Sequence, residues 1–265
     1  MKVFLNGISL AYGDKGTGPA VVLIHGFPLC RRMWRPQENA LAEAGFRVIT
    51  PDLRGFGDSD APEGAYSMSL FADDIISLLD HLNIGKAVVG GMSMGGYVLL
   101  NMLERFPERI IAACFIVTRG TADDEAARDG RMAFMETIRR FGIGSVTEAF
   151  IPYLFADESA KDPETRGHMT RWMGRADTRG VEGTLHALLE RKDYTPLLGQ
   201  FTKPSLVIGA EEDRTIVGED LRALTDGLPD SELVVIPGAG HMVNVEKPDA
   251  FNECIISFLR RVTPQ

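Results

Sequence analysis

The sequence is poor in cysteine and has no cluster of cysteine and histidine. Its 265 residues include three cysteines, and these lie far apart between mostly apolar neighbours. An odd number of isolated cysteines speaks against a disulfide framework and is typical of buried, reduced thiols in a cytoplasmic protein. No cysteine lies at metal-ligand spacing from a histidine, so we expect no metal site.

Clustered positive charge and long hydrophobic runs are also absent. The formal net charge is −9, and no run of lysine or arginine forms a basic stripe. This balance speaks against nucleic acid and anionic membranes as partners. The chain starts directly with a strand pattern, without the apolar core of a signal peptide, and no apolar run has the length of a membrane span. We therefore expect a cytoplasmic protein that does not bind a membrane.

Apolar residues, at 45%, are sufficient for one large α/β domain. Asn6-Gly7 between two apolar segments predicts a β-hairpin. Apolar runs typical of buried strands occupy residues 20–24, 46–50, 86–90, 109–117, 205–209 and 232–236. Segments with helical spacing alternate with them at residues 35–44, 69–82, 95–105, 219–227 and 248–261. The alternation predicts a mostly parallel central sheet flanked by helices on both faces.

This alternation stops in the middle of the chain. Residues 118–202 contain no strong strand pattern, only helical stretches at 124–141, 146–155, 163–175 and 181–190. We therefore expect an α/β core formed by residues 1–117 and 203–265. A helical cap, or lid, formed by residues 118–202 would be inserted before the last two strands.

The central motif of the chain is Gly91-Met92-Ser93-Met94-Gly95, which fits the pattern G-x-S-x-G. Glycines two residues either side of a serine relieve crowding in a turn that strains the serine backbone and exposes its hydroxyl. The predicted helix directly behind Ser93 would favour negative charge beside the hydroxyl. Five residues with two free positions also occur by chance, so the strand before the motif and the helix after it give the motif its weight.

A nucleophilic serine needs a base, and the base needs an orienting acid. His241 follows the predicted strand at 232–236, and loops at the carboxyl ends of parallel strands share one edge of the sheet. Asp213 follows the strand at 205–209 and gives the chain order serine, acid, histidine. The other acids that follow strands are alternatives to Asp213: Glu211, Glu212, Asp123 and Asp124.

Other polar residues near this edge have a structural interpretation. His25 would shape its turn, and the remaining histidines, His81, His168 and His186, fall in predicted helices. We expect Asp52 and Arg54 to form an ion pair that fixes their loop. Two backbone N–H groups are placed to stabilise an oxyanion, those of Met94 and Phe27, whereas Pro28 has no N–H to donate.

Several motifs together resemble the α/β-hydrolase superfamily over nearly the whole chain. They are His25-Gly26-Phe27-Pro28, Asp52-Leu53-Arg54-Gly55-Phe56-Gly57-Asp58-Ser59, Gly91-Met92-Ser93-Met94-Gly95-Gly96, Asp213 and Gly240-His241. The Ser-Met-Gly-Gly and Asp-Leu-Arg-Gly forms resemble the branch with 3-oxoadipate enol-lactonases, carboxylesterases and cofactor-free haloperoxidases. Dehalogenases and epoxide hydrolases with similar early loops carry aspartate where this chain has Ser93.

The resemblance implies an α/β-hydrolase fold, with Ser93 as nucleophile, His241 as base and Asp213 as its partner. It also implies Phe27 and Met94 as oxyanion donors, a helical lid and no cofactor. The substrate would then be a small ester or lactone, cleaved through an acyl-enzyme on Ser93. Two alternatives keep the triad, namely perhydrolase (haloperoxidase-like) activity and carbon–carbon bond hydrolysis. A third is a ligand-binding sensor on a hydrolase scaffold.

Side chains on the predicted lid are candidates for substrate contact. Flexible methionines would form an adaptable apolar surface. The lid candidates are Met132, Phe134, Met135, Ile138, Met169, Trp172 and Met173, and Trp34 and Met242 extend the set. The same helical spacing is expected if these residues pack the lid onto the core. Arginines of this region could pair with a substrate carboxylate or lie on the surface: Arg119, Arg166, Arg171 and Arg175.

Overall fold

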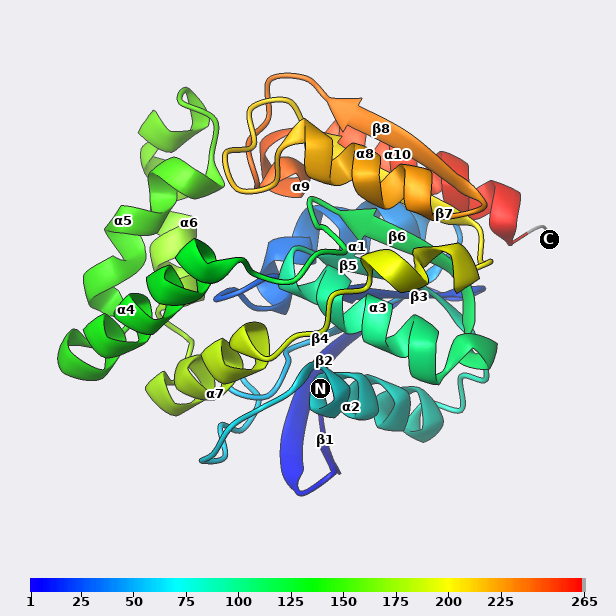
Figure 1. Cartoon of the computed structure of the whole chain (residues 1–265). Coiled ribbons are helices and arrows are strands. Elements are labelled where there is room, and N and C mark those ends of the chain that lie inside the picture. The colour runs from blue at the N-terminus through cyan, green and yellow to red at the C-terminus, as the bar shows by residue number, and fades with distance from the viewer. Residues whose placement is uncertain (264–265) are drawn as a thin grey trace.

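An eight-stranded sheet runs through the molecule (Figure 1). The computed structural model describes residues 1–263, apart from the side chains of Ser145, Val146, Glu148 and Ala149. The strands are β1 (Lys2–Leu5), β2 (Ile8–Lys15), β3 (Ala20–Ile24), β4 (Arg47–Pro51), β5 (Ala87–Met92), β6 (Ile110–Ile116), β7 (Ser205–Ala210) and β8 (Ser231–Ile236). Their order is β1-β2-β4-β3-β5-β6-β7-β8. β2 is antiparallel to β1 and β4, and the other neighbours are parallel, which confirms the predicted fold class.

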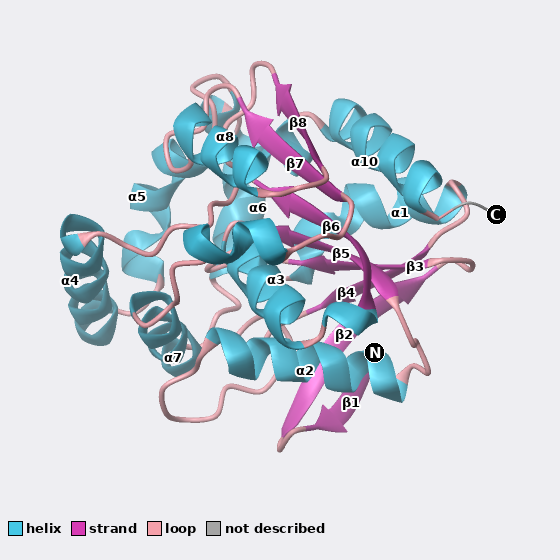
Figure 2. Ribbon diagram, turned by 45° about the vertical axis from the view of Figure 1, so that its right-hand side comes forward, coloured by secondary structure: helices cyan, strands magenta, loops and turns pink. Residues whose placement is uncertain are grey.

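Helices cover both faces of this sheet (Figure 2). One hydrophobic core contains residues of α2 (Met68–His81), α3 (Met94–Arg105) and α8 (Gly218–Gly227). A second core contains residues of α1 (Arg35–Glu43), α9 (Val243–Glu246) and α10 (Pro248–Val262). Every residue of β3 and β5 is buried, since both faces of these strands lie under helices.

Four helices between β6 and β7 gather at one side of the sheet, on the left in Figure 1. They are α4 (Glu125–Phe141), α5 (Gly144–Leu154), α6 (Pro163–Met173) and α7 (Thr178–Leu189). Backbone hydrogen bonds attach them to the rest of the chain. The N–H of Tyr66 donates to the carbonyl of Gly183 at 3.0 Å, and that of Met242 donates to Leu154 at 2.8 Å.

The helices begin where polar side chains satisfy free backbone N–H groups. Ser67, Asp124 and Asp162 accept hydrogen bonds from the third residue after each of them, at the starts of α2, α4 and α6. Four short 3₁₀ helices were not predicted: η1 (Arg31–Trp34), η2 (Pro107–Arg109), η3 (Ser159–Lys161) and η4 (Thr195–Gln200). Such short turns, like the four-residue α9, are too brief to leave a periodic signal.

The expected ion pair between Asp52 and Arg54 is wrong. Two residues apart in their loop, the two side chains point to different partners. Arg54 forms a buried, bidentate salt bridge with Asp74 of α2, in which both N···O distances are 2.7 Å. Asp52 instead pairs with Arg31 and accepts the backbone N–H of Asp58 at 2.8 Å.

The three cysteines are free thiols, with Cys30 and Cys114 buried and Cys254 half-buried. Within the described residues, no helix has both the length and the apolar character that a bilayer span requires.

The α7 helix touches the loop after β4 backbone to backbone. A Cβ atom at Gly180 would lie 2.2 Å from Cα of Gly55, too close for either backbone to remain in place. We expect Gly180→Ala to lower the free energy of unfolding by about 2 kcal/mol, as overpacking does elsewhere. Gly130→Ala on α4 is the matched control, because its Cβ would meet nothing within 4 Å. That substitution should stabilise the protein by about 0.5–1 kcal/mol. Urea denaturation measures both, and equal effects of the two substitutions would refute the contact.

Candidate active site

Ser93 lies in a strained turn between β5 and α3. Its φ of 51° and ψ of −113° are rare for a residue with a side chain. Neighbouring elements hold this backbone in place. The N–H of Ser93 donates to the carbonyl of Ile116 at 2.9 Å, and the hydroxyl of Thr118 donates to the carbonyl of Ser93 at 2.8 Å.

The glycines of the motif are required by close backbone contacts. A Cβ at Gly91 would lie 2.2 Å from the carbonyl oxygen of Gly95, and one at Gly95 would lie 2.4 Å from that of Ile24. Only residues without a Cβ allow the turn to close this tightly against β3. Gly26 brings the loop after β3 beside the turn, because its Cβ position is 3.5 Å from the Cβ of Ser93.

His241 and Asp213 form a buried hydrogen-bonded pair. The distance between Nδ1 of His241 and Oδ2 of Asp213 is 2.8 Å, and both side chains are almost fully buried. The other oxygen of Asp213 accepts the backbone N–H groups of Thr215 and Ile216 at 2.7 and 3.1 Å. A carboxylate in this position favours the tautomer with the proton on Nδ1, which leaves Nε2 as the proton acceptor.

The alternative acids lie elsewhere. Glu211 is exposed and accepts the N–H of Gly238 at 3.0 Å, and Glu212 is also exposed. Asp124 caps the start of α4, whereas Asp123 pairs with arginines. Of the five acids, Asp213 alone hydrogen-bonds to His241 within the described part of the chain.

His25 has a structural environment, as the sequence predicts. Its Nε2 accepts the backbone N–H of Leu53 at 3.0 Å, and its Nδ1 lies 2.8 Å from the carbonyl of Gly26. Burial lowers the pKa of His25, although the nearby carboxylate of Asp52 opposes this effect. A neutral imidazole therefore joins the loops after β3 and β4. The ring of Phe27 packs edge-on against Phe56 with the centroids 6.0 Å apart.

Ser93 and His241 line one cavity of about 760 Å³. Phe27 and Met94 also line it, and Met94 is the first residue of α3, where backbone N–H groups have no acceptor within the helix. Much of the remaining wall is apolar and comes from α3, α4, α5, α7 and the segment after β7. These residues include Tyr97, Phe134, Phe150, Leu154, Leu185, Leu188 and Ile216. Tyr97 follows Ser93 by one helical turn, so the sequence spacing could have indicated that Tyr97 lies beside Ser93 in the cavity wall.

Eight of the nine side chains considered for substrate contact do not line this cavity. Among them, Ile138 is buried in the first core and Met169 in the second. Trp34, Met173 and Met242 have no exposed surface and belong to the second core, where Trp34 packs against Phe251. Met135 lies in the first core, and Met132 projects into solvent with 52% of its surface exposed. Trp172 lines a different cavity. Phe134, between Met132 and Met135 on α4, is the lid candidate that reaches the Ser93 cavity.

A cluster of charges occupies one wall of the cavity and was not predicted. The carboxylate of Asp123 has no exposed surface and pairs with Arg131, Arg191 and Arg119 at 2.5, 2.6 and 3.3 Å. Burial opposes the charge on Asp123, but hydrogen bonds from Arg131 and Arg191 outweigh it and hold the pKa of this carboxyl well below its usual range. The Arg119–Asp123 pair is local, with a spacing of four residues, but Arg131 of α4 and Arg191 after α7 meet Asp123 only in the fold.

Glu246 connects the His241 loop to the helical insertion. Its two oxygens accept the backbone N–H groups of Gly240 and Ala156, both at 2.9 Å. Burial raises the pKa of Glu246, although these two hydrogen bonds partly oppose the effect. Glu246 thus fixes the residue directly before His241.

Within the described residues, no group of three His, Cys, Asp or Glu side chains is arranged to hold a metal ion.

The profile of the alpha/beta hydrolase family matches residues 21–254, and the chain belongs to this family. An esterase from Thermogutta terrifontis, solved with malate bound, is 36% identical, with a TM-score of 0.95 over 99% of each chain. A bromoperoxidase from Bacillus anthracis is 28% identical, with a TM-score of 0.87 over 96% of each chain. The curated 3-oxoadipate enol-lactonase 2 of Acinetobacter baylyi is 28% identical over 98% of this chain and 94% of its own length.

Replacing the half-buried carboxylate Glu246 tests its role in holding the His241 loop. Glu246→Gln keeps one acceptor oxygen and puts an NH₂ group against one of the two N–H donors. Because a buried donor then lacks a partner, we expect the free energy of unfolding to fall by about 1–3 kcal/mol at pH 7, measured by urea denaturation. Glu253→Gln, at an exposed position of α10, is the control and should change stability by less than about 0.5 kcal/mol. Equal stability of the two variants would contradict the assigned role.

Proposed function

We propose that the chain is a serine hydrolase that cleaves a small carboxylic ester or lactone through an acyl-enzyme on Ser93. The observation that carries the proposal is the His241–Asp213 pair, whose histidine lines the same cavity as a serine held in a strained, left-handed turn. Membership of the alpha/beta hydrolase family and the likeness to an esterase and an enol-lactonase support it.

In the first half of the reaction, Nε2 of His241 takes the proton of the Ser93 hydroxyl as its oxygen attacks the substrate carbonyl. The negative charge that develops on the carbonyl oxygen would be stabilised by the backbone N–H groups of Met94 and Phe27. When the tetrahedral intermediate collapses, the carbon–oxygen bond to the leaving group breaks. His241 then gives the same proton to the departing alkoxide.

Water completes the cycle. His241 takes a proton from water as the oxygen of water attacks the acyl carbon, and the ester bond to Ser93 breaks. The Ser93 oxygen regains a proton from His241, and the carboxylic acid leaves. Asp213 stays ionised and stabilises the imidazolium that forms twice in each cycle. These residues complete the proton transfers without a cofactor.

The shape of the cavity indicates the substrate class. Aromatic and aliphatic walls from Phe134, Phe150 and Leu188 would take a short apolar acyl or alcohol group. The helices of residues 118–202 supply several of these walls, so we propose that this segment acts as the lid of the site. The likeness to a bromoperoxidase supports peroxide as a second acceptor for the acyl group. Product analysis with and without peroxide distinguishes peracid from carboxylic acid.

Removing either proton-transfer partner tests the mechanism. We expect Ser93→Ala and His241→Ala each to lower kcat for p-nitrophenyl acetate by about 10⁴-fold or more, since the residues act as a unit. The double variant should be no slower than either single one. Ser257→Ala and His81→Ala, both at exposed positions, are the controls and should keep the wild-type rate. Substantial turnover by either active-site variant, with the fold intact by circular dichroism, would refute the assignment.

Asp213→Asn tests the tautomer. The amide oxygen would stay with the N–H groups of Thr215 and Ile216, which places the NH₂ group against Nδ1 of His241. The imidazole must then carry its proton on Nε2, where it cannot accept one from Ser93. We expect kcat to fall by about 10²- to 10⁴-fold. Asp226→Asn, an exposed change on α8, is the control. An unchanged kcat in Asp213→Asn would show that another group orients the base.

A further inference from the structure

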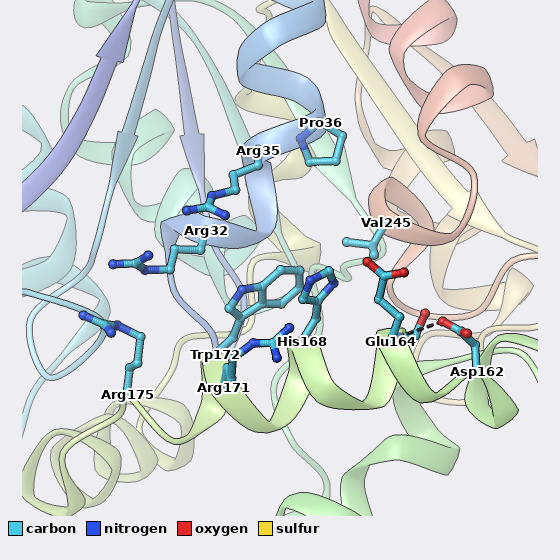
Figure 3. Close-up of a pocket in the computed structure, with 11 residues that line it drawn as sticks. Arg32, Arg35, Pro36, Asp162, Glu164, His168, Arg171, Trp172, Arg175 and Val245 are labelled. Carbon is cyan, nitrogen blue, oxygen red and sulfur yellow. Dashed lines mark hydrogen bonds between the residues drawn. The ribbon is translucent and has the colours of Figure 1, made fainter.

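A second cavity, of about 550 Å³, lies between η1, the start of α1, α6 and α9 (Figure 3). It shares no lining residue with the Ser93 cavity. Its volume is within the range of small-molecule binding sites. One wall belongs to the core and carries Arg32 and Arg35, and the facing wall belongs to α6 and the residues after it, with Arg171 and Arg175.

These arginines form part of a local excess of positive charge in an acidic protein. Asp58 is shared by three guanidinium groups, at 2.8 Å from Arg31, at 3.3 Å from Arg32 and in direct contact with Arg175. Arg31 also pairs with the buried carboxylate of Asp52. Guanidinium groups held this close repel one another, and one shared carboxylate compensates the repulsion only in part.

Two further arginines of the cavity have no carboxylate at all. Arg35 and Arg171 form no ion pair within the described residues, and both are exposed and line the cavity. In addition, Nε of Arg32 is buried without a hydrogen-bond acceptor among the residues described. The five guanidinium groups of this region thus outnumber Asp52 and Asp58, the two carboxylates that pair with three of them. The chain as a whole carries a net charge of −9, so the charge balance here is opposite to that of the whole protein.

The other end of the cavity has a different character. Asp162 and Glu164 lie there, separated from the arginines by the stacked rings of His168 and Trp172 (Figure 3). The two rings are stacked with their centroids 5.4 Å apart and an interplanar angle of 8°. Even with these two carboxylates counted, the guanidinium groups are in excess. An anionic group would be repelled from the acidic end and attracted to the arginine end.

We infer that this second cavity is a binding site for a small organic polyanion, whose acidic groups pair with Arg32, Arg35, Arg171 and Arg175. Guanidinium groups bind phosphate and carboxylate oxygens through two parallel N–H···O bonds, and both chemistries fit the arrangement. Such a ligand would supply the missing countercharge. Since the walls come from the core and from the helical insertion, the bound anion would also bridge the two.

Tryptophan fluorescence provides a direct readout. Trp172 lines the cavity, and the second tryptophan of the chain, Trp34, is fully buried against Phe251. The full-length protein is titrated with sodium pyrophosphate and, separately, with citrate at constant ionic strength. We expect a saturable change in emission that is lost in Trp172→Phe. Tighter binding of pyrophosphate identifies a phosphorylated ligand, and tighter binding of citrate identifies a polycarboxylate.

Arg35→Gln/Arg171→Gln is the informative variant, because it removes two charges and leaves the network around Asp58 intact. It should bind the preferred anion at least about tenfold more weakly. Arg222→Gln, an exposed arginine on α8, changes the same kind of charge elsewhere and should bind like wild type. Both variants should hydrolyse a neutral p-nitrophenyl ester at the wild-type rate. The proposal is overturned if calorimetry finds no binding of either anion, or if the two variants lose affinity equally.

Discussion

The left-handed backbone at Ser93 is the constraint on which the rest of the site depends. A φ of 51° is unfavourable in a residue with a Cβ, so favourable contacts with the surrounding structure have to stabilise this conformation. β6 holds the N–H of Ser93, Thr118 holds its carbonyl, and glycines at positions 91 and 95 let the turn close against β3. The parallel sheet and its buried strands therefore position one hydroxyl at the sheet edge. The loops after β3, β7 and β8 reach the same edge and carry the other polar groups.

A buried carboxylate, Asp213, and a half-buried one, Glu246, extend this arrangement beyond the serine. Asp213 uses one oxygen for the backbone of its own loop and the other for His241, so the loop geometry and the orientation of the imidazole are set together. Glu246 then joins the residue before His241 to Ala156 of the helical insertion. One side chain thereby connects the insertion to the histidine loop. The segment that supplies much of the cavity wall is also attached to the proposed base.

Much of the fold could be predicted from the sequence, because long apolar runs and helical spacing identify elements such as β3, α2 and α10 within one or two residues. The serine turn was also predictable, since its glycines are a local requirement. The environments of the side chains in the helical insertion could not be predicted in this way. Met132, Phe134 and Met135 lie on one helix, but their side chains differ in environment. Met132 is exposed to solvent, Phe134 lines the cavity and Met135 packs in the first core. Helical spacing alone does not distinguish a residue that faces a cavity from one that packs against the core. Arg191 lies far in the sequence from its partner Asp123, as Arg54 does from Asp74, so no local pattern revealed these two pairs.

The central claim is that Ser93 is an activated nucleophile, and its most direct test is covalent labelling with a fluorophosphonate followed by intact-mass measurement and peptide mapping. We expect a single adduct per chain, on the peptide that contains Ser93. Labelling should slow strongly when His241 is replaced by alanine, because the hydroxyl then loses its base. An adduct on another residue, or a folded wild-type protein that the reagent leaves unlabelled, would contradict it.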